Sequence, residues 1–455
     1  MKTKLPLSAF VALSFAPISW LSAQEPTTSE DQEKLENMVV VAYKQARPVQ
    51  EVVGDVSVLS ADDIAQSMSQ DMANTVKYEA NIHIEDGGTR FGTSGINIRG
   101  MGENRVAIEI DGIPNAKTFD LGSYSFATAG FPEIDLIQNI EILNGPASTV
   151  YGSDALGGIV AINTWDPDVL LANQEDDNWT RLRLGYDGKR HGRFISVSSA
   201  WDFNNQGLLL SATQRDGKGV VNENSDLAKD TADWDAQSIF GKWKVNTANG
   251  NTLTLGIQAN QKDQTTQINS FIGQGRFSRT SSLAAADESK DQKFSIDYDF
   301  LLGSSFADEG SALVYHAATD FKQDTYENRS SRRGTPLFQF RQFNYDSTRT
   351  GLELNFTKSW SNNTAQHDLI YGFEYTQTEV KESRDATETN LITHVSTNFV
   401  LGENFPLRDF PITDVKEIGL FIHDEISFDD SNRTLVPAIR FDYYDLSPNR
   451  DSLFD

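Results

Sequence analysis

Apolar and polar residues alternate along most of the second half of the chain. From residue 178 onward, apolar side chains recur at every second position, as in the runs from Leu253 to Ala259 and from Phe294 to Phe300. This period of two is typical of β-strands that have one apolar and one polar face. It predicts eleven strands, at 179–187, 192–202, 207–215, 235–245, 251–260, 292–300, 311–325, 343–358, 366–381, 415–428 and 433–445.

The connections between these strands alternate in length after the first hairpin. The short ones are 203–206, 246–250, 301–310, 359–365 and 429–432, and the long ones are 216–234, 261–291, 326–342 and 382–414. Short turns on one side and long extracellular loops on the other are typical of outer-membrane β-barrels. A soluble β-sandwich, which is the alternative for an all-β pattern, has no reason for such alternation.

The number of predicted strands indicates an incomplete barrel. Both ends of such a barrel normally face the periplasm, so the strand count is even, and plugged outer-membrane transporters have about 22 strands. Here eleven strands are followed by Ser447 and Pro448, in what should be another long loop. We therefore expect about half a barrel, from a fragment or a truncated product; closure by oligomerisation is the alternative.

The first part of the chain mixes helix and strand signals. Val49 to Leu59 predicts a strand, and Ser60 is a suitable N-cap for a helix that begins at Ala61, with acidic residues in its first turn. The segment from Ile140 to Thr164 predicts two strands joined through Gly-Pro and Gly-Gly turns. An ordinary hairpin of a soluble domain is the alternative for that segment.

The amino terminus predicts export from the cytoplasm. Lys2 and Lys4 precede an apolar run from Leu5 to Leu21, and the small residue Ala23 suits signal-peptidase cleavage. Residues 24–36 are polar and acidic, which is typical of a flexible leader. No later run approaches the roughly 18 apolar residues of a membrane-spanning helix. A membrane location would therefore require a closed barrel.

Composition excludes several classes of function. The net charge of −26 and the isoelectric point near 4.6 argue against nucleic-acid binding. The absence of cysteine excludes disulfides and cysteine-based metal sites. The six histidines lack metal-ligand spacing, and no nucleophile elbow or catalytic triad is recognisable. We therefore predict neither an enzyme nor a resident metal site.

Three motifs in the first part of the chain occur in the order found in one protein family. They are NIRG at 97–100, V-x-I-x-I-D-G-I-P at 106–114 and IEILNGPASTVYGSDALGG at 140–158. Together they resemble the plug domain of TonB-dependent outer-membrane receptors. The matching residues are Arg99, Gly100, Asp111, Gly112, Gly145, Pro146, Tyr151, Gly152, Gly157 and Gly158.

The resemblance implies a transmembrane antiparallel β-barrel with an N-terminal mixed α/β plug domain inside its lumen. We assign residues 1–23 to a signal peptide, 24–47 to a flexible leader, 48–166 to the plug and 178–455 to the N-terminal part of the barrel. It also implies a bacterial outer-membrane location and TonB-dependent transport of an iron source. A passive porin or a binding-only surface protein is the alternative, although neither needs a domain that fills the lumen.

A short β-prone segment interrupts the polar leader. It consists of Met38, Val39, Val40, Val41 and Ala42. An extended apolar segment on a free leader can add itself to the sheet edge of a partner. The segment resembles the TonB box in sequence and position, which implies that its partner is the periplasmic C-terminal domain of TonB. A stray edge strand is the alternative.

The segment from Gly87 to Gly95 resembles the haem and haemoglobin branch of the same family. This implies haem as a transported ligand and no prosthetic group. Many haem receptors place an axial histidine in the plug loop after the Asp-Gly turn, and this chain has Tyr124 and Phe126 there instead. Tyrosine can ligate haem iron. A packing role for Tyr124, and a ferric siderophore as the ligand, are the alternatives.

Three arginines fall in one predicted long loop. Arg329, Arg332 and Arg333 are basic residues of an acidic protein. Because arginine binds carboxylates in a bidentate manner, they could contact haem propionates or an anionic siderophore. A solvated loop without a binding role is the alternative.

Overall fold

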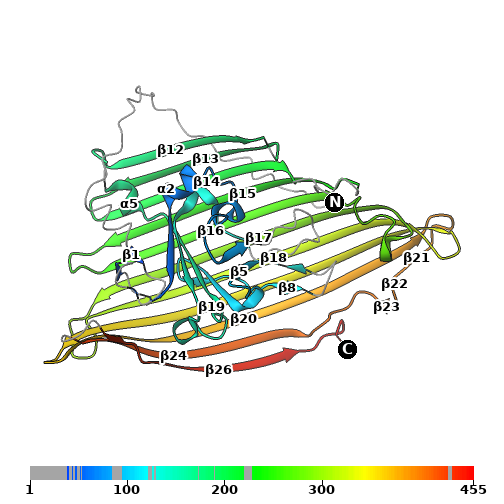
Figure 1. Cartoon of the computed structure of the whole chain (residues 1–455). Helices are drawn as coiled ribbons and strands as arrows, with labels where there is room; N and C mark the ends of the chain where they lie inside the picture. The colour runs from blue at the N-terminus through cyan, green and yellow to red at the C-terminus, as the bar shows by residue number, and fades with distance from the viewer. Residues whose placement is uncertain are drawn as a thin grey trace.

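A long antiparallel sheet curves around a small mixed domain in the computed structural model (Figure 1). The structure describes residues 38–39, 44, 47–48, 52, 54–84, 95–120, 126–127, 130–172, 174–188, 190–219, 228–428 and 433–454. The small domain lies against the concave side of the sheet (Figure 1). This arrangement agrees with the predicted combination of a mixed α/β domain and antiparallel barrel strands.

The small domain is built on a five-stranded sheet. The strand order is β3 (Val56–Ser60), β10 (Ile137–Asn144), β11 (Gly158–Thr164), β6 (Val106–Ile110) and β7 (Ile113–Pro114). Its other elements are α2 (Ala61–Gln66), α3 (Met72–Thr75), β4 (Ile82–Ile84), β5 (Ile96–Ile98), η2 (Glu103–Arg105), β8 (Phe119–Asp120), β9 (Phe126–Ala127), η3 (Ile134–Leu136), α4 (Ser148–Tyr151) and α5 (Pro167–Leu171). None of the described helices is long and apolar enough to cross a membrane.

Isoleucines from several of these strands form the core of the small domain. Ile98, Ile140 and Ile162 are fully buried in one apolar cluster. The predicted cap of α2 is confirmed, because the Ser60 hydroxyl accepts from the Asp63 amide at 3.2 Å and Asp63 accepts from the Ser60 amide at 2.9 Å.

All eleven predicted strands are present in the large sheet, and neighbours in sequence pair antiparallel. They are β12 (Asn178–Asp187), β13 (Gly192–Asp202), β14 (Gln206–Lys218), β15 (Thr231–Asn246), β16 (Thr252–Gln267), β17 (Thr280–Leu301), β18 (Glu309–Ser330), β19 (Pro336–Ser361), β20 (Ala365–Asn390), β24 (Ile412–Phe428) and β26 (Ala438–Asn449). Short pieces add β21 (Ser396–Thr397), β22 (Phe399–Val400), β23 (Glu403–Asn404), β25 (Thr434–Leu435) and η4 (Gly275–Phe277). Among the described strands, β12 and β26 each have one neighbour, so the sheet is open.

Several strands extend further than predicted. The strands β19 and β20 each contain 26 residues. All four predicted long loops are therefore too long, because the connections span only 219–230, 268–279, 331–335 and 391–411. The pattern was missed because a strand outside the bilayer is wetted on its outer face. Apolar alternation then stops, although backbone pairing continues.

One end of the sheet carries an outward-facing apolar band. Ile257, Phe294, Val314, Leu420 and Ile422 are each 43–49% exposed, and they lie toward the strand ends joined by turns 247–251, 302–308 and 362–364. Such a band faces lipid in transmembrane barrels. Crossing a bilayer needs roughly 9–11 tilted residues, so more than half of β19 and β20 lies beyond it. In such barrels the short turns lie at the periplasmic end and the long connections at the extracellular end.

Candidate functional site

A lysine from the leader is buried between the small domain and the sheet. The Nζ atom of Lys44 lies 2.8 Å from Oε1 of Glu353 and 2.6 Å from Oε1 of Glu374. Its side chain is only 7% exposed, and Nζ also lies 5.0 Å from the centre of the Tyr151 ring and 5.6 Å from that of Phe421. Lys44 therefore joins the leader to both other parts of the structure.

The two glutamates need a cation because of their positions in the sheet. Glu353 of β19 and Glu374 of β20 are direct partners in the antiparallel register. Like charges that face each other across two strands are destabilising. Lys44 bridges the pair, so its ammonium group compensates a repulsion that the sheet itself creates.

A second cation ties the last strand to the small domain. Arg440 of β26 donates from Nη2 to Glu374 at 2.6 Å and from Nη1 to the carbonyl of Val150 at 2.8 Å. Gly152, with a φ of 80°, lies beside this guanidinium group, and a Cβ atom there would lie 3.3 Å from Nη2 of Arg440. Glu374 thus accepts from cations that belong to two different segments.

Glu109 of β6 adds a third carboxyl group to the same cluster. Burial raises its pKa to about 8; Lys44 opposes this shift, while Glu353 and Glu374 reinforce it. Burial acts to lower the pKa of Lys44, but Glu353, Glu374 and Glu109 raise it well above its usual range. At neutral pH the lysine is therefore charged and Glu109 is largely protonated.

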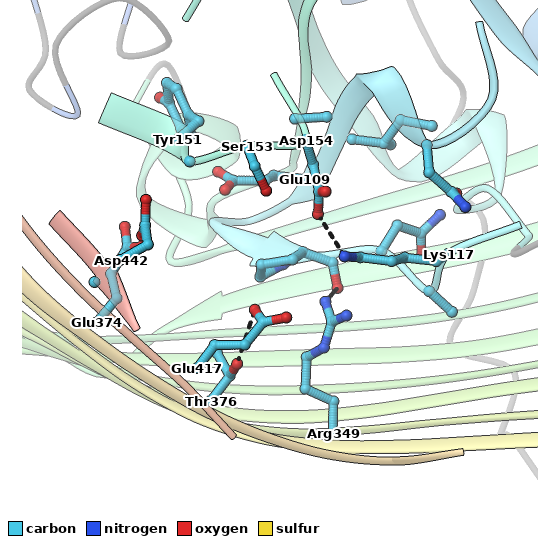
Figure 2. Close-up of a pocket in the computed structure, with 18 of the residues that line it drawn as sticks. Glu109, Lys117, Tyr151, Ser153, Asp154, Arg349, Glu374, Thr376, Glu417 and Asp442 are labelled. Atoms are coloured by element: carbon cyan, nitrogen blue, oxygen red, sulfur yellow. Dashed lines mark hydrogen bonds and ion pairs between the residues drawn. The ribbon is translucent and has the colours of Figure 1, made fainter. Parts of the chain in front are cut away.

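The cluster lines one side of a cavity between the small domain and the sheet. Figure 2 shows Glu109, Tyr151 and Asp154 on the small domain, facing Arg349 and Glu374 on the strands. An ion pair of 2.9 Å joins Lys117 to Asp154 at the exposed side of this cavity. The cavity is polar and charged, so changes in charge at its wall can alter how firmly the two parts hold together.

Replacing Glu109 by glutamine should remove a pH dependence of stability. Because the folded-state pKa is raised from 4.5 to about 8, the stability contributed by protonated Glu109 is fully present below about pH 4.5. It is lost as the pH rises through about 8. Glu109→Gln should flatten this decline, as measured by urea unfolding between about pH 5 and 9. Glu103→Gln, at an 81% exposed carboxylate, is the control, and an unchanged slope in Glu109→Gln would contradict the assignment.

Comparison with known proteins identifies the family. The family model "TonB-dependent Receptor Plug Domain" matches residues 48–159, and "TonB dependent receptor-like, beta-barrel" matches residues 240–454. The chain belongs to the TonB-dependent receptors. The small domain is their plug and the large sheet is part of their barrel, which places the protein in the bacterial outer membrane.

Individual relatives differ in the ligands that their names record. The chain is 25% identical over 206 residues to the vitamin B12 transporter BtuB of Vibrio vulnificus, which is 45% of this chain and 31% of that protein. It is 30% identical over 175 residues to hemoglobin-binding protein A of Haemophilus influenzae, which is 36% of this chain and 17% of that protein. The ferric preacinetobactin receptor BauA of Acinetobacter baumannii superposes with a TM-score of 0.62 at 14% identity, covering 91% of this chain and 61% of that one. The chain thus spans less than two thirds of each of these proteins.

The predicted plug-motif residues build the plug and its contact with the barrel. Asp111 accepts from the amide and hydroxyl of Thr164 at 2.8 and 2.6 Å. Arg99 forms an ion pair with Asp55. A Cβ atom on Gly158 would lie 2.3 Å from the carbonyl of Leu143, so the turn between β10 and β11 requires glycine. Of the predicted motif residues, Tyr151 and Gly152 lie closest to the charged cluster.

The predicted TonB box and haem contacts are only partly covered by the structure. Met38 and Val39 form β1, which pairs with β2 (Arg47–Pro48), while Val40, Val41 and Ala42 lie outside the described residues. Tyr124 also lies outside them. The backbone of Phe126 pairs with Asp120 in the hairpin of β8 and β9. These assignments stay predictions.

The three arginines do not share one loop. Arg329 lies within β18, with Nη1 3.6 Å from Glu327, so its predicted loop position is wrong. The physical reason is that β18 and β19 continue to pair beyond the bilayer. Arg332 and Arg333 are exposed in the turn 331–335. They lie at the extracellular end, away from the charged cluster.

Sequence reasoning missed the residues that make up the charged cluster. Lys44, Glu353, Glu374 and Arg440 belong to no motif, and Glu109 occupies a position that the V-x-I-x-I-D-G-I-P motif does not specify. The available signal was two glutamates on neighbouring predicted strands. That signal becomes informative only when the strand register is known.

Proposed function

We propose that this receptor imports haem, free or released from haemoglobin, across the outer membrane with energy supplied through TonB. The proposal of transport rests on the position of Lys44. This residue follows the predicted TonB box in the sequence, and its ammonium group lies between two barrel glutamates. A pull on the leader therefore acts directly on the contact between plug and barrel.

The mechanism follows from the charges. Withdrawal of the leader by TonB removes Lys44 from Glu353 and Glu374, which then face each other across β19 and β20. Arg440 remains beside Glu374 and holds α4 through the Val150 carbonyl. Lys44 then no longer links Tyr151 of the plug to the two barrel glutamates, which weakens the contact on one side of the plug. The plug then rearranges and admits the ligand.

The choice of haem rests on resemblance. The Gly87–Gly95 segment resembles haem receptors, and hemoglobin-binding protein A is among the relatives. Tyr124 is proposed as an iron ligand and Phe126 as a further ligand contact, and haem is cargo here, with no resident cofactor proposed. The likeness to BauA concerns the fold alone, and a ferric siderophore is the second candidate ligand.

Growth of an iron-starved bacterium that expresses the receptor tests this proposal. We expect growth on haemin that requires both the receptor and TonB, and no growth on ferric hydroxamates or catecholates. Growth on a ferric siderophore but not on haemin would overturn the ligand. Growth on haemin without TonB would instead indicate a passive pore. Tyr124→Phe should reduce haemin binding at least tenfold if the phenolate is a ligand, because the ring is retained.

A further inference from the structure

Segment 391–411 folds back along the far end of β20. The amides of Arg384 and Leu407 each donate to the other residue's carbonyl at 2.9 Å, and β21 of the segment pairs with β20. Ala386 of β20 is fully buried where the segment packs on it. Strands β21 and β22 mark the segment at the right of Figure 1. The segment is therefore docked on the strand by a defined set of contacts.

Buried charged residues lie where the segment meets β20. Glu382 of the strand is 1% exposed, and its Oε2 atom accepts from the Asp409 amide at 2.8 Å. The carboxylate of Asp409 forms an ion pair with Arg384. Arg408 donates to the backbone carbonyl of Glu382, and its Nε atom lies 2.9 Å from Asp451. Both arginines are thus engaged by carboxylates other than that of Glu382.

This part of β20 lies beyond the lipid-facing band. Successive side chains of a strand point to opposite faces, so Lys381 and Glu379 lie on the face opposite to Glu382. They form an ion pair there, and their side chains are 41% and 39% exposed. Charged side chains are unfavourable on the lipid face of a barrel, so this level of the strand is in water. Glu382 therefore responds to the pH outside the cell.

Two carboxyl oxygens of this site are buried without a hydrogen-bond partner among the residues that the structure describes. They are Oε1 of Glu382 and Oδ2 of Asp409. A buried polar atom without a partner is costly. The Asp409 amide already bonds Glu382, so the two carboxyl groups belong to one site. One proton, bound to one of these oxygens and donated to the other, satisfies both atoms.

The surroundings of Glu382 favour its protonated form. Burial raises its pKa to about 7, and the carboxylate of Asp409 adds to this shift. The Asp409 amide, Arg384 and Arg408 oppose the shift without cancelling it. The geometry and the titration of the site thus agree, because both indicate one retained proton.

The other groups packed around the site supply no separate cation. Glu403 of the segment lies 3.5 Å from Arg384 and adds a further carboxylate. The register partner of Glu382 on β19 is Tyr345, whose ring stacks with that of Phe119 of the plug at 5.2 Å between centres. An ionised Glu382 therefore has only cations that it shares with another carboxylate.

We propose that Glu382 and Asp409 form a proton-dependent clasp that holds segment 391–411 on β20. In the closed clasp the two carboxyl groups share one proton, and the segment stays docked. When the proton is lost, two buried carboxylates repel each other and the segment detaches. Detachment also withdraws Phe410, whose ring contacts that of Phe119 edge-on at 5.5 Å between centres. The clasp does not depend on which iron source the receptor transports.

The pH range of the transition follows from proton linkage. In the docked state the pKa of Glu382 is about 7, whereas a detached, solvated carboxyl has its ordinary value near 4.5. Docking is therefore strongest below about pH 4.5 and weakens as the pH rises through about 7. The docking equilibrium can change by roughly two orders of magnitude across this range.

Cysteine labelling in outer membranes tests the clasp, because the chain has no cysteine of its own. Ala386→Cys places a reporter under the docked segment, and Thr393→Cys places one on its exposed part. The maleimide labelling rate at position 386 is divided by that at position 393, which corrects for ionisation of the thiol. This ratio should rise at least tenfold from about pH 5.5 to about pH 8.5. With Glu382→Gln it should stay low, because the amide donates to Asp409 at every pH.

Two further variants complete the test. In Asp409→Asn the new amide can donate to Glu382 without a shared proton, so the ratio should again stay low at high pH. The control is Glu379→Gln, which removes a carboxylate from the outer face of the same strand and should retain the rise. A ratio that is independent of pH in the unaltered background would overturn the clasp, as would a rise that persists in Glu382→Gln. If Glu382→Gln does not fold, a rise that persists in Asp409→Asn overturns it.

Discussion

Replacing Val40 by proline is expected to abolish uptake while leaving ligand binding intact. Proline removes a backbone N–H and fixes φ, so the segment from Met38 to Ala42 could no longer add as a strand to a partner's sheet. The proposed ligand contacts Tyr124 and Phe126 are untouched by this change. The measurement is accumulation of iron-labelled haemin by cells, set against equilibrium binding of haemin to the same cells.

A second proline variant controls for general damage to the leader. Gln32→Pro places the same residue in the polar part of the leader, upstream of the segment that begins at Met38. It should retain nearly normal uptake. If Val40→Pro also transports normally, the predicted TonB box is wrong, and the energy reaches the plug through another segment.

The membrane-spanning parts of the strands could be predicted from sequence, whereas their extracellular extensions could not. The alternation from Leu253 to Ala259 falls within β16, where lipid lies on one side and polar lumen on the other. In β18 the residues from Lys322 to Arg329 are mostly polar on both faces, and they still pair with β19 along their whole length. The inward-facing Gln323, Thr325 and Glu327 of this segment are polar although they are buried, so the apolar period of two disappears while the strand continues.

The turns of the plug could be predicted because single residues dictate them. Gly152 and Gly158 have φ angles of 80° and 142°, which other residues rarely adopt. Ser60 and Asp63 form a cap within one turn of chain. Each of these features depends on neighbours in sequence, so local rules suffice.

The charged cluster depends on contacts that no local rule contains. Lys44 meets Glu353 and Glu374 across 309 and 330 positions of sequence. Its position requires the register of β19 with β20, the path of the leader and the placement of the plug within the barrel. The sequence alone presents a lysine in a polar leader and two glutamates among 65 acidic residues.

Replacing Lys44 by methionine is expected to expose the leader in the absence of ligand. Methionine keeps most of the buried stem but removes the ammonium group, so Glu353 and Glu374 face each other without their shared cation. Removing one partner of a buried ion pair typically costs about 3–5 kcal/mol. The leader should therefore become sensitive to protease before ligand is added, and the denaturant midpoint of the folded receptor should fall.

Two further variants distinguish a specific charge effect from lost packing. Adding Glu353→Gln to Lys44→Met removes the repulsion and should restore much of the stability, although the leader stays free because its anchor is missing. Lys117→Met breaks an ion pair whose two side chains are each 41% exposed, so it should cost no more than about 1 kcal/mol. A leader that stays protected in Lys44→Met would mean that Lys44 does not couple it to the barrel. A double variant no more stable than Lys44→Met would mean that packing around Tyr151 and Phe421, and not carboxylate repulsion, accounts for the loss.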